Sequence, residues 1–418
     1  MPIDSRWYQQ LLEITVSADT TWLRDLVHVP KYEQERFLEH KIENPRFVCD
    51  TTTSQREKIS ALHALRALIS REETNPYIYR LYIDKIDAHL TRLMMFECTR
   101  VGDDIGFFEH SVTLYGAPKK SFFSYVAHRI HAQVSNMQVP SSHRDAQLRM
   151  HAITSKISMT HDIVSPDMLP EISETDGIVI SAEETKDIFL KTLMNYEIDG
   201  WSVRIDPRRR IFSVHSQHKC VYIPPDSALR ERKILFTETR ARALAEHEIG
   251  VHVRRAHEGA KQSLKLLEYG LAGYLRGEEG LAGYAQQQIE GSSEFYGFDR
   301  YFALSLAVGL DGTPRDFRSV FECMVDYYTL TRTHDSHTRV RAEQLAWEVC
   351  ARIFRGTTGQ CTGLVFTRDI VYLEGNVGIW NLLVKNPHLY SSLFIGKYDP
   401  LNEAQVTTLQ ALEILPQW

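Results

Sequence analysis

The chain has 418 residues, of which 43% are hydrophobic, and its formal net charge at pH 7 is -6. A chain of this length can bury a large hydrophobic core and is long enough for two lobes. The negative net charge argues against broad nucleic-acid binding, which requires a basic surface. No apolar run approaches the ~20 residues of a membrane-spanning helix, so no membrane partner is expected.

The N-terminus and the cysteines predict a cytoplasmic protein. The first residues, Met-Pro-Ile-Asp-Ser-Arg-Trp, lack the apolar stretch of a signal peptide. The six cysteines are scattered and form no CxxC pair. Such a distribution is typical of reduced thiols and not of a disulfide framework.

The first third of the chain is expected to be mainly helical. Apolar residues recur there at three- and four-residue spacing, as in helices with one buried face, at residues 54–71, 77–100 and 122–134. Residues 136–175 have a weaker pattern and several prolines, which indicates a linker or lobe boundary.

Two parts of the chain follow from this boundary. The first is a mainly helical N-terminal lobe at residues 1–150, and the second is a domain at residues 170–418; the two can pack as one unit. Further helices are expected towards the end of the second part, at residues 315–332, 340–354, 376–383 and 403–415.

The middle of the chain contains a helix start signal and three candidate strands. Ser181-Ala-Glu-Glu184 forms a capping box, which predicts a helix from there to about Tyr196. Residues 201–206 and 211–214 flank a proline-containing turn and predict a β-hairpin, and a third strand is predicted at residues 220–223. We therefore expect a small antiparallel sheet beside the helix that follows.

That helix, predicted from about Thr237 to Glu258, contains His247-Glu-Ile-Gly-Val-His252. In the HExxH pattern of zinc hydrolases, two histidines four residues apart bind the metal and the glutamate activates water. A spacing of five residues places the histidines about 140° apart on a regular α-helix, instead of about 40°. Both rings can reach one ion if the helix widens into a π-bulge or ends near His252. Gly250 would ease such a distortion.

A catalytic zinc ion also needs a third protein ligand and an open position for water. Glu278 and Glu279 lie in the segment Gly-Glu-Glu-Gly-Leu-Ala-Gly at residues 277–283, and Glu268 precedes a near-copy of this segment. On pattern alone all three glutamates are candidates. Glu248 lies four residues before His252, near the same helical face, and is the candidate general base.

The combination of HEIGxH with EEGLA resembles the microtubule-associated tyrosine carboxypeptidases and their bacterial relatives with a QEGLA motif. The resemblance spans about residues 105–395. It implies that His247, His252 and Glu279 bind one zinc ion and that Glu248 is the catalytic base. The expected fold is α+β and predominantly α-helical, with a zincin-like catalytic core and the small antiparallel sheet beside the HExxxH helix. Residues 170–418 would then be the metallopeptidase domain.

Residues that contact the substrate are suggested by neighbouring family-like motifs. A carboxypeptidase must bind a free C-terminal carboxylate, and arginine does this with two parallel hydrogen bonds. Arg255, Arg355 and Arg368 are candidates, and each has the alternative role of a structural ion-pair partner. Tyr372 is a candidate donor to the developing oxyanion, with a half-buried core aromatic as the alternative.

The predicted function is a zinc-dependent metallo-carboxypeptidase that removes a C-terminal residue, such as tyrosine or another aromatic residue, from peptides or protein tails. The alternative is a non-catalytic or regulatory metal-binding relative. Glu248 favours the enzyme, because a structural metal site does not need a base beside the ion. Tubulin is a candidate substrate, but the chain is shorter than the animal tubulin-directed enzymes, so we also expect other protein tails.

Overall fold

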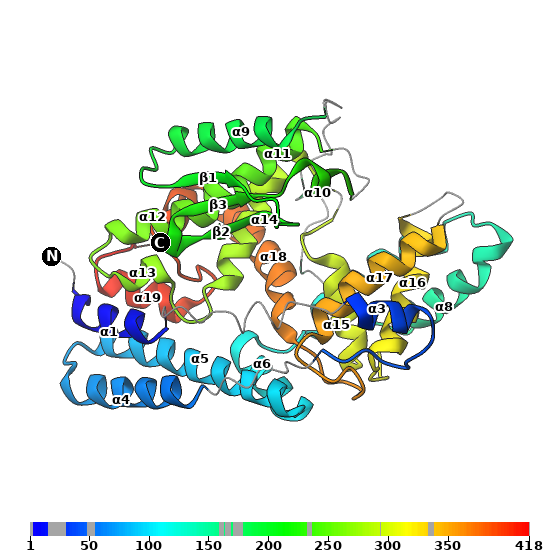
Figure 1. The fold of residues 1–418 in the computed structure, drawn as a ribbon, viewed down its shortest axis with the longest axis horizontal. Helices are drawn as coiled ribbons and strands as arrows, with labels where there is room; N and C mark the ends of the chain where they lie inside the picture. The colour runs from blue at the N-terminus through cyan, green and yellow to red at the C-terminus, as the bar shows by residue number, and fades with distance from the viewer. Residues whose placement is uncertain are drawn as a thin grey trace.

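The computed structural model describes residues 3–15, 31–47, 55–158, 163, 169, 179–231, 236–292, 294–332 and 338–417. The described residues form mainly helices and one three-stranded sheet (Figure 1), which confirms the predicted α+β, predominantly helical class. Within these residues, no helix combines the length and the apolar character that crossing a membrane requires.

The N-terminal part is helical, as predicted. Its helices are α1 (Ser5–Thr15), α3 (Lys31–Leu38), α4 (Arg56–Glu72), α5 (Pro76–Val101), α6 (Asp104–Tyr115), α7 (Lys120–Ser135) and α8 (Arg144–Thr154), with a 3-10 turn η1 (Ser141–His143). The three expected helices correspond to α4, α5 and α7. Asn75 caps the start of α5, because its side chain accepts hydrogen bonds from two backbone N–H groups of the first turn, and Pro76 is the first helical residue.

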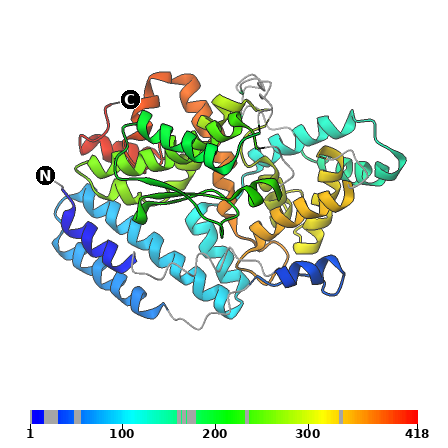
Figure 2. The ribbon, with the colours of Figure 1, turned by 45° about the horizontal axis from the view of Figure 1, so that its top comes forward.

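The segment expected to be a linker contains a helix that the sequence pattern did not predict. Helix α8 lies beside α16 at one end of the molecule (Figures 1 and 2). Its residues Ala146 and Met150 are buried in the largest apolar cluster. These buried residues of α8 occur only once per helical turn, so the apolar stripe of this helix is too narrow to stand out in the sequence. Most of residues 159–178 lie outside the described part.

The sheet is mixed, and the prediction of a β-hairpin is wrong. Its strands are β1 (Ser202–Ile205), β2 (Ser213–His215) and β3 (Cys220–Ile223), with a 3-10 turn η2 (Ser216–His218) before β3. The order is β1-β3-β2, with β3 parallel to β1 and antiparallel to β2. Strand β3, which holds the central place, is the most buried of the three.

One face of the sheet packs on the helix that carries the histidines. The flanking helices are α9 (Ala182–Asn195) and α10 (Asp226–Glu231). Phe189 and Leu193 of α9, Val221 of β3, and Ile249 and Val253 of the histidine helix belong to one buried cluster. The capping box predicted at the start of α9 is confirmed, because both of its reciprocal hydrogen bonds are present.

The remaining helices build the C-terminal half. They are α11 (Glu238–Ala245), the π-helix η3 (Glu246–Val253), α12 (Arg254–Lys261), α13 (Leu266–Tyr269), α14 (Leu275–Glu290), α15 (Phe298–Val308), α16 (Phe317–Thr331), α17 (Thr338–Phe354), the 3-10 segments η4 (Thr367–Asp369) and η5 (Pro387–Phe394), α18 (Ile370–Lys385) and α19 (Glu403–Ala411). The four helices expected here correspond to α16, α17, α18 and α19. Helix α18 begins six residues before the predicted start.

Two buried apolar clusters join distant parts of the chain. The largest contains residues of α7 and α8 together with residues of α15 to α18, and the second contains residues of α1, α4 and α5 together with α13 and α19. Each therefore crosses the boundary that the sequence suggested near residues 150–170.

Helices α14 and α18 approach each other unusually closely. A Cβ atom on Gly280 would lie 2.3 Å from the carbonyl carbon of Gly375, and a Cβ atom on Gly375 would lie 2.1 Å from the carbonyl oxygen of Arg276. Only glycine at both positions permits this contact. The contact fixes the rotation of α14, which carries the candidate third ligand.

Candidate metal centre

The two histidines of the HExxxH segment lie on a π-helix. Residues Glu246–Val253 form η3, and helical structure continues without interruption into α12. The predicted π-type widening is therefore confirmed, and the alternative of a helix end near His252 is wrong. Because hydrogen bonds in a π-helix join residues five apart, residues at this spacing return to one face. The rings of His247 and His252 have their centroids 5.0 Å apart.

The third group of the constellation is Glu279, in the first turn and a half of α14. One ligand atom from each of His247, His252 and Glu279 lies within 4.8 Å of the other two. Glu279 Oε2 is 4.0 Å from His252 Nε2. Ligands on tetrahedral zinc lie about 3.3–3.5 Å apart. A small contraction would therefore bring the three groups to zinc-binding distances.

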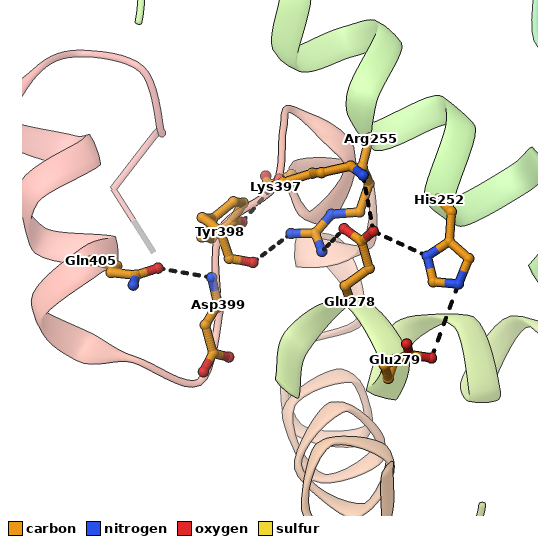
Figure 3. A network of polar contacts seen from close by, with 9 residues as sticks. His252, Arg255, Glu278, Glu279, Lys397, Tyr398, Asp399 and Gln405 are labelled. Atoms are coloured by element: carbon orange, nitrogen blue, oxygen red, sulfur yellow. Dashed lines mark hydrogen bonds and ion pairs between the residues drawn. The ribbon is translucent and has the colours of Figure 1, made fainter. Parts of the chain in front are cut away.

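The other two candidate glutamates face elsewhere. Glu278 lies behind His252, where one carboxylate oxygen accepts a hydrogen bond from His252 Nδ1 at 3.0 Å (Figure 3). Glu268 accepts a hydrogen bond from the hydroxyl of Tyr8 at 3.0 Å, far along the chain in α1. The structure thus brings Glu279, and neither Glu278 nor Glu268, beside both histidines.

Each histidine is oriented by a hydrogen bond at Nδ1. His247 Nδ1 lies 3.1 Å from Gln286 Oε1, and Gln286 donates in turn to Glu290 at 2.7 Å. His252 Nδ1 lies against Glu278. Both contacts place a proton on Nδ1 and leave the Nε2 lone pairs for a metal ion, as is common for metal-binding histidines. The donor set and its tautomers therefore fit a divalent metal.

Glu278 also neutralises two buried cations. Its second oxygen accepts from Arg255 at 3.2 Å, and Lys397 lies 3.3 Å from the oxygen that contacts His252. Arg255 also donates to the backbone carbonyl of Tyr398 (Figure 3). Burial alone would raise the pKa of Glu278, but Lys397, His252 and Arg255 lower it to about 2. Glu278 is therefore ionised within a buried network.

The pKa values around the centre reflect crowding of acidic groups in a buried place. Burial raises the pKa of Glu248 to about 7, with Glu279 adding to the effect and His252 opposing it. Burial and the neighbouring His252 lower the pKa of His247 to about 3. Burial also opposes charge on His252, but Glu278 and Glu279 raise its pKa to about 9. A divalent cation would offset this local excess of carboxylates.

The three arginines suggested by the sequence have different surroundings. Arg255 is completely buried and is bound within the Glu278 network. Arg355 is also buried and donates to Asp369 at 3.3 Å. Both thus have the ion-pair role that the sequence left open. Arg368 is half-buried, and its Nε has no hydrogen-bond partner among the described residues. The pKa of Arg368 is raised by nearby groups that include Tyr372 and Glu279, although burial opposes its charge.

Tyr372 lies in α18 between the centre and an arginine that the sequence did not suggest. Its hydroxyl accepts a hydrogen bond from Arg352 at 2.8 Å, and its ring centroid lies 5.8 Å from that of Tyr296. Tyr296 in turn lies 5.8 Å from the ring of His247. Arg300 lies over the face of Tyr372 at 4.9 Å. Arg352, Arg300 and Tyr296 thus extend the site beyond the predicted residues.

Of the residues that extend the site, Arg352 could have been suggested by its position in the sequence. Arg352 lies one helical turn before Arg355, so the two project from neighbouring positions on α17, and both bind Asp369. Gln286 and Tyr296 carry no charge and belong to no recognised pattern, so only their spatial contacts identify them.

Comparison with known proteins assigns the chain to a family. A family model for microtubule-associated tyrosine carboxypeptidases matches residues 155–417. No curated protein was found to match the chain. The matched segment contains the π-helix, the three candidate ligands and the tyrosine–arginine group around α18. Because the match covers more than half of the 418 residues, the chain belongs to the family of microtubule-associated tyrosine carboxypeptidases.

Proposed function

We propose that this protein is a zinc-dependent carboxypeptidase that removes the C-terminal residue, such as tyrosine or another aromatic residue, from peptides or protein tails. The observation that carries the proposal is the convergence of His247, His252 and Glu279, with Glu248 beside them. Three protein ligands leave a position for water or substrate, as catalytic zinc requires. A zincin-like organisation, with a sheet beside the metal helix, is part of this proposal.

Bound zinc would polarise the scissile carbonyl and lower the pKa of water. Glu248 then takes the proton from the attacking water and gives it to the leaving amine. In the metal-free protein, burial raises the pKa of Glu248 to about 7, so this carboxyl group can take up and release a proton near neutral pH. Gln286 and Glu278 hold the two imidazoles with Nε2 towards the ion.

The substrate's terminal carboxylate would bind at the arginines around Tyr372. Arg352 keeps 31% of its side-chain surface exposed although its Nε binds Asp369. Arg368 contributes a second guanidinium, whose Nε has no hydrogen-bond partner among the residues that the structure describes. Burial opposes the charge of both arginines, but Asp369 and Tyr372 raise the pKa of Arg352, and Tyr372 raises that of Arg368. Glu279 adds to both effects, which supports a position of the two guanidinium groups near the ligand set. A fork of this kind selects a free C-terminus over an internal peptide bond.

The edge of the sheet would align the peptide backbone. Within the described residues, β2 pairs only with β3, so its other edge is open, and β2 lies against η3. An extended tail can add to such an edge by backbone hydrogen bonds. Tyr372 would donate a hydrogen bond to the oxyanion that forms beside the ion.

Mass spectrometry of a peptide library with varied C-terminal residues tests the proposal. We expect loss of one C-terminal residue, fastest from peptides that end in tyrosine or another aromatic residue, and no such loss with Glu248→Gln. The Glu248→Gln protein should bind as much zinc as the wild type. Internal cleavage would instead indicate an endopeptidase. Intact peptides with a zinc-loaded wild type would favour the non-catalytic alternative.

The cellular setting remains part of the proposal. The five described cysteines, Cys98, Cys220, Cys323, Cys350 and Cys361, are all free thiols. Free thiols of this number are typical of a reducing compartment such as the cytoplasm. A tubulin tail is one substrate to include in the library, because the family is named for microtubule association.

A further inference from the structure

A cavity of about 410 Å³ lies between α5, α6, the segment that precedes α14, and the start of α18. None of the candidate metal ligands lines it. Part of its wall is apolar and includes Leu114, Tyr115, Leu271 and Val371. The remaining wall on α5 has an unusual set of basic side chains.

Three of these side chains form a stripe on α5. Lys85, His89 and Arg92 are spaced by four and three residues, so they lie on one helical face, and all three line the cavity. Lys85 is 5% exposed and His89 is 9% exposed. Lysines this deeply buried are normally paired with a carboxylate.

Lys85 has no carboxylate partner among the described residues. Its ammonium group donates to the backbone carbonyl of Gly270 and lies 4.4 Å from the centroid of the Tyr269 ring. Burial lowers the pKa of Lys85, and the charges of Arg92 and Lys397 lower it further. The two charges that most affect the pKa of Lys85 are therefore both positive.

His89 and Arg92 are similarly short of partners. His89 Nε2 is buried and has no hydrogen-bond partner within the described part of the chain, while its Nδ1 lies 3.4 Å from Arg92. Within the described residues, His89 is also the one side chain with which Arg92 makes a polar contact. Burial and the charges of Lys85 and Arg92 lower the pKa of His89.

The acidic residues of the cavity are already neutralised by other arginines. Asp84 pairs with Arg80 at 2.9 Å, Asp87 with Arg66 at 2.7 Å, and Asp399 with Arg276 at 2.8 Å. The cavity therefore contains basic groups without counter-charges, beside an apolar wall. Buried groups of one sign are costly unless an opposite charge accompanies them.

We propose that this cavity binds an organic anion, with a carboxylate or phosphate group held by Lys85, His89 and Arg92. The apolar body of the ligand would lie against Leu114, Tyr115 and Leu271. Such an anion supplies the acceptor that His89 Nε2 lacks and the counter-charge that Lys85 and Arg92 lack. Neither the candidate metal ligands, nor Glu248, nor the arginines around Tyr372 line this cavity, so the proposal does not depend on the peptidase chemistry.

Isothermal titration calorimetry of the zinc-loaded full chain tests the site with three probes of similar size. Phenyl phosphate and benzoate have an anionic group on an aromatic ring, and benzyl alcohol is the neutral control. We expect at least one of the two anions to bind and the alcohol not to bind. Comparison of phenyl phosphate with inorganic phosphate shows whether the apolar wall contributes, and tighter binding of phenyl phosphate is expected. Failure of both anions to bind would overturn the proposal, as would equal binding of the alcohol.

Variants locate the binding. Arg92→Gln and Lys85→Met should each weaken anion binding at least tenfold. Arg100→Gln is the matched control, because Arg100 lies on the same helix but pairs with Glu97 at 2.9 Å and does not line the cavity. It should bind the anion as the wild type does. The free Lys85→Met protein should unfold at a temperature no lower than the wild type, because it lacks an unneutralised buried charge. Unchanged anion binding by both Arg92→Gln and Lys85→Met would refute the site.

Discussion

The adjacent residues Glu278 and Glu279 should respond oppositely to the same substitution. Replacing Glu278 with glutamine removes the one negative charge that Arg255 and Lys397 share within the Glu278 network. Arg255 is 0% exposed and Lys397 is 7% exposed, so both cations are left buried without a counter-charge in that network. Removing one partner of a buried ion pair costs about 3–5 kcal/mol. Among the described residues, Glu279 has no buried arginine or lysine partner, and its contact with His252 Nε2 is long, at 4.0 Å, while Glu278 also neutralises that histidine. Glu279→Gln should therefore change the stability of the metal-free fold much less.

The expected change in melting temperature follows from the size of the chain. Unfolding entropy is about 2.1 cal/mol/K per residue, which for 418 residues gives about 0.9 kcal/mol/K. A loss of about 3–5 kcal/mol then lowers Tm by about 3–6 °C if the chain unfolds as one unit. Calorimetry of the metal-free proteins should show this decrease for Glu278→Gln and a change below about 1 °C for Glu279→Gln.

Zinc binding should show the reverse order. Loss of the group that orients a metal-binding histidine weakens metal affinity about 10–100-fold, whereas loss of a ligand is more severe. Competition titration with a chromophoric chelator should therefore find weakened binding in Glu278→Gln and no stoichiometric zinc in Glu279→Gln. Equal Tm values for the two metal-free variants, or weaker zinc binding in Glu278→Gln than in Glu279→Gln, would refute the assignment of the two roles.

Three further predictions concern pH, packing and the oxyanion. Burial lowers the pKa of His252, but Glu278, Glu279 and Glu248 together raise it to about 9, so zinc must displace a proton at pH 7. Its affinity should rise about tenfold per pH unit from pH 7 towards 9 in chelator competition, and a flat profile would contradict this. Gly280→Ala should lower the free energy of unfolding, measured in urea, by about 1–3 kcal/mol, because the new methyl group meets the backbone of Gly375. The zinc content should also decrease. Unchanged stability would show that α14 can shift freely. Tyr372→Phe should lower kcat about 10²–10³-fold with little change in KM if its hydroxyl serves the oxyanion, and a change of less than twofold would leave it as a core aromatic.

Much of the fold could be predicted from local patterns. The capping box at Ser181 and the apolar spacing in α4, α5 and α7 depend on residues within a few turns of each other. Strand positions were also local, and the segment Cys220–Ile223 was predicted with its observed bounds. The pairing of the strands could not be predicted in this way, because the order β1-β3-β2 depends on how the strands pack against the helices around them.

The site also has parts that local sequence patterns predict and parts that depend on contacts between distant segments. The spacing of His247 and His252 indicated either a widened helix or a helix end near His252, since no regular α-helix brings both rings together. Adjacent glutamates on a helix lie about 100° apart, and sequence periodicity cannot say which one faces the histidines. That choice depends on the rotation of α14, which the contact between Gly280 and Gly375 fixes. These glycines lie 95 residues apart, so their contact leaves no mark in either local segment.

The π-helix has a consequence for how this centre relates to the more common zinc motif. Deleting Val251 would leave His-Glu-Ile-Gly-His, a regular HExxH segment. If the π-turn then closed to a regular α-turn, the two histidines would again lie on one face, and Arg255 would keep its direction towards Glu278. The extra residue of the long motif is therefore absorbed within the π-helix, so that the second histidine and its supporting network stay in phase.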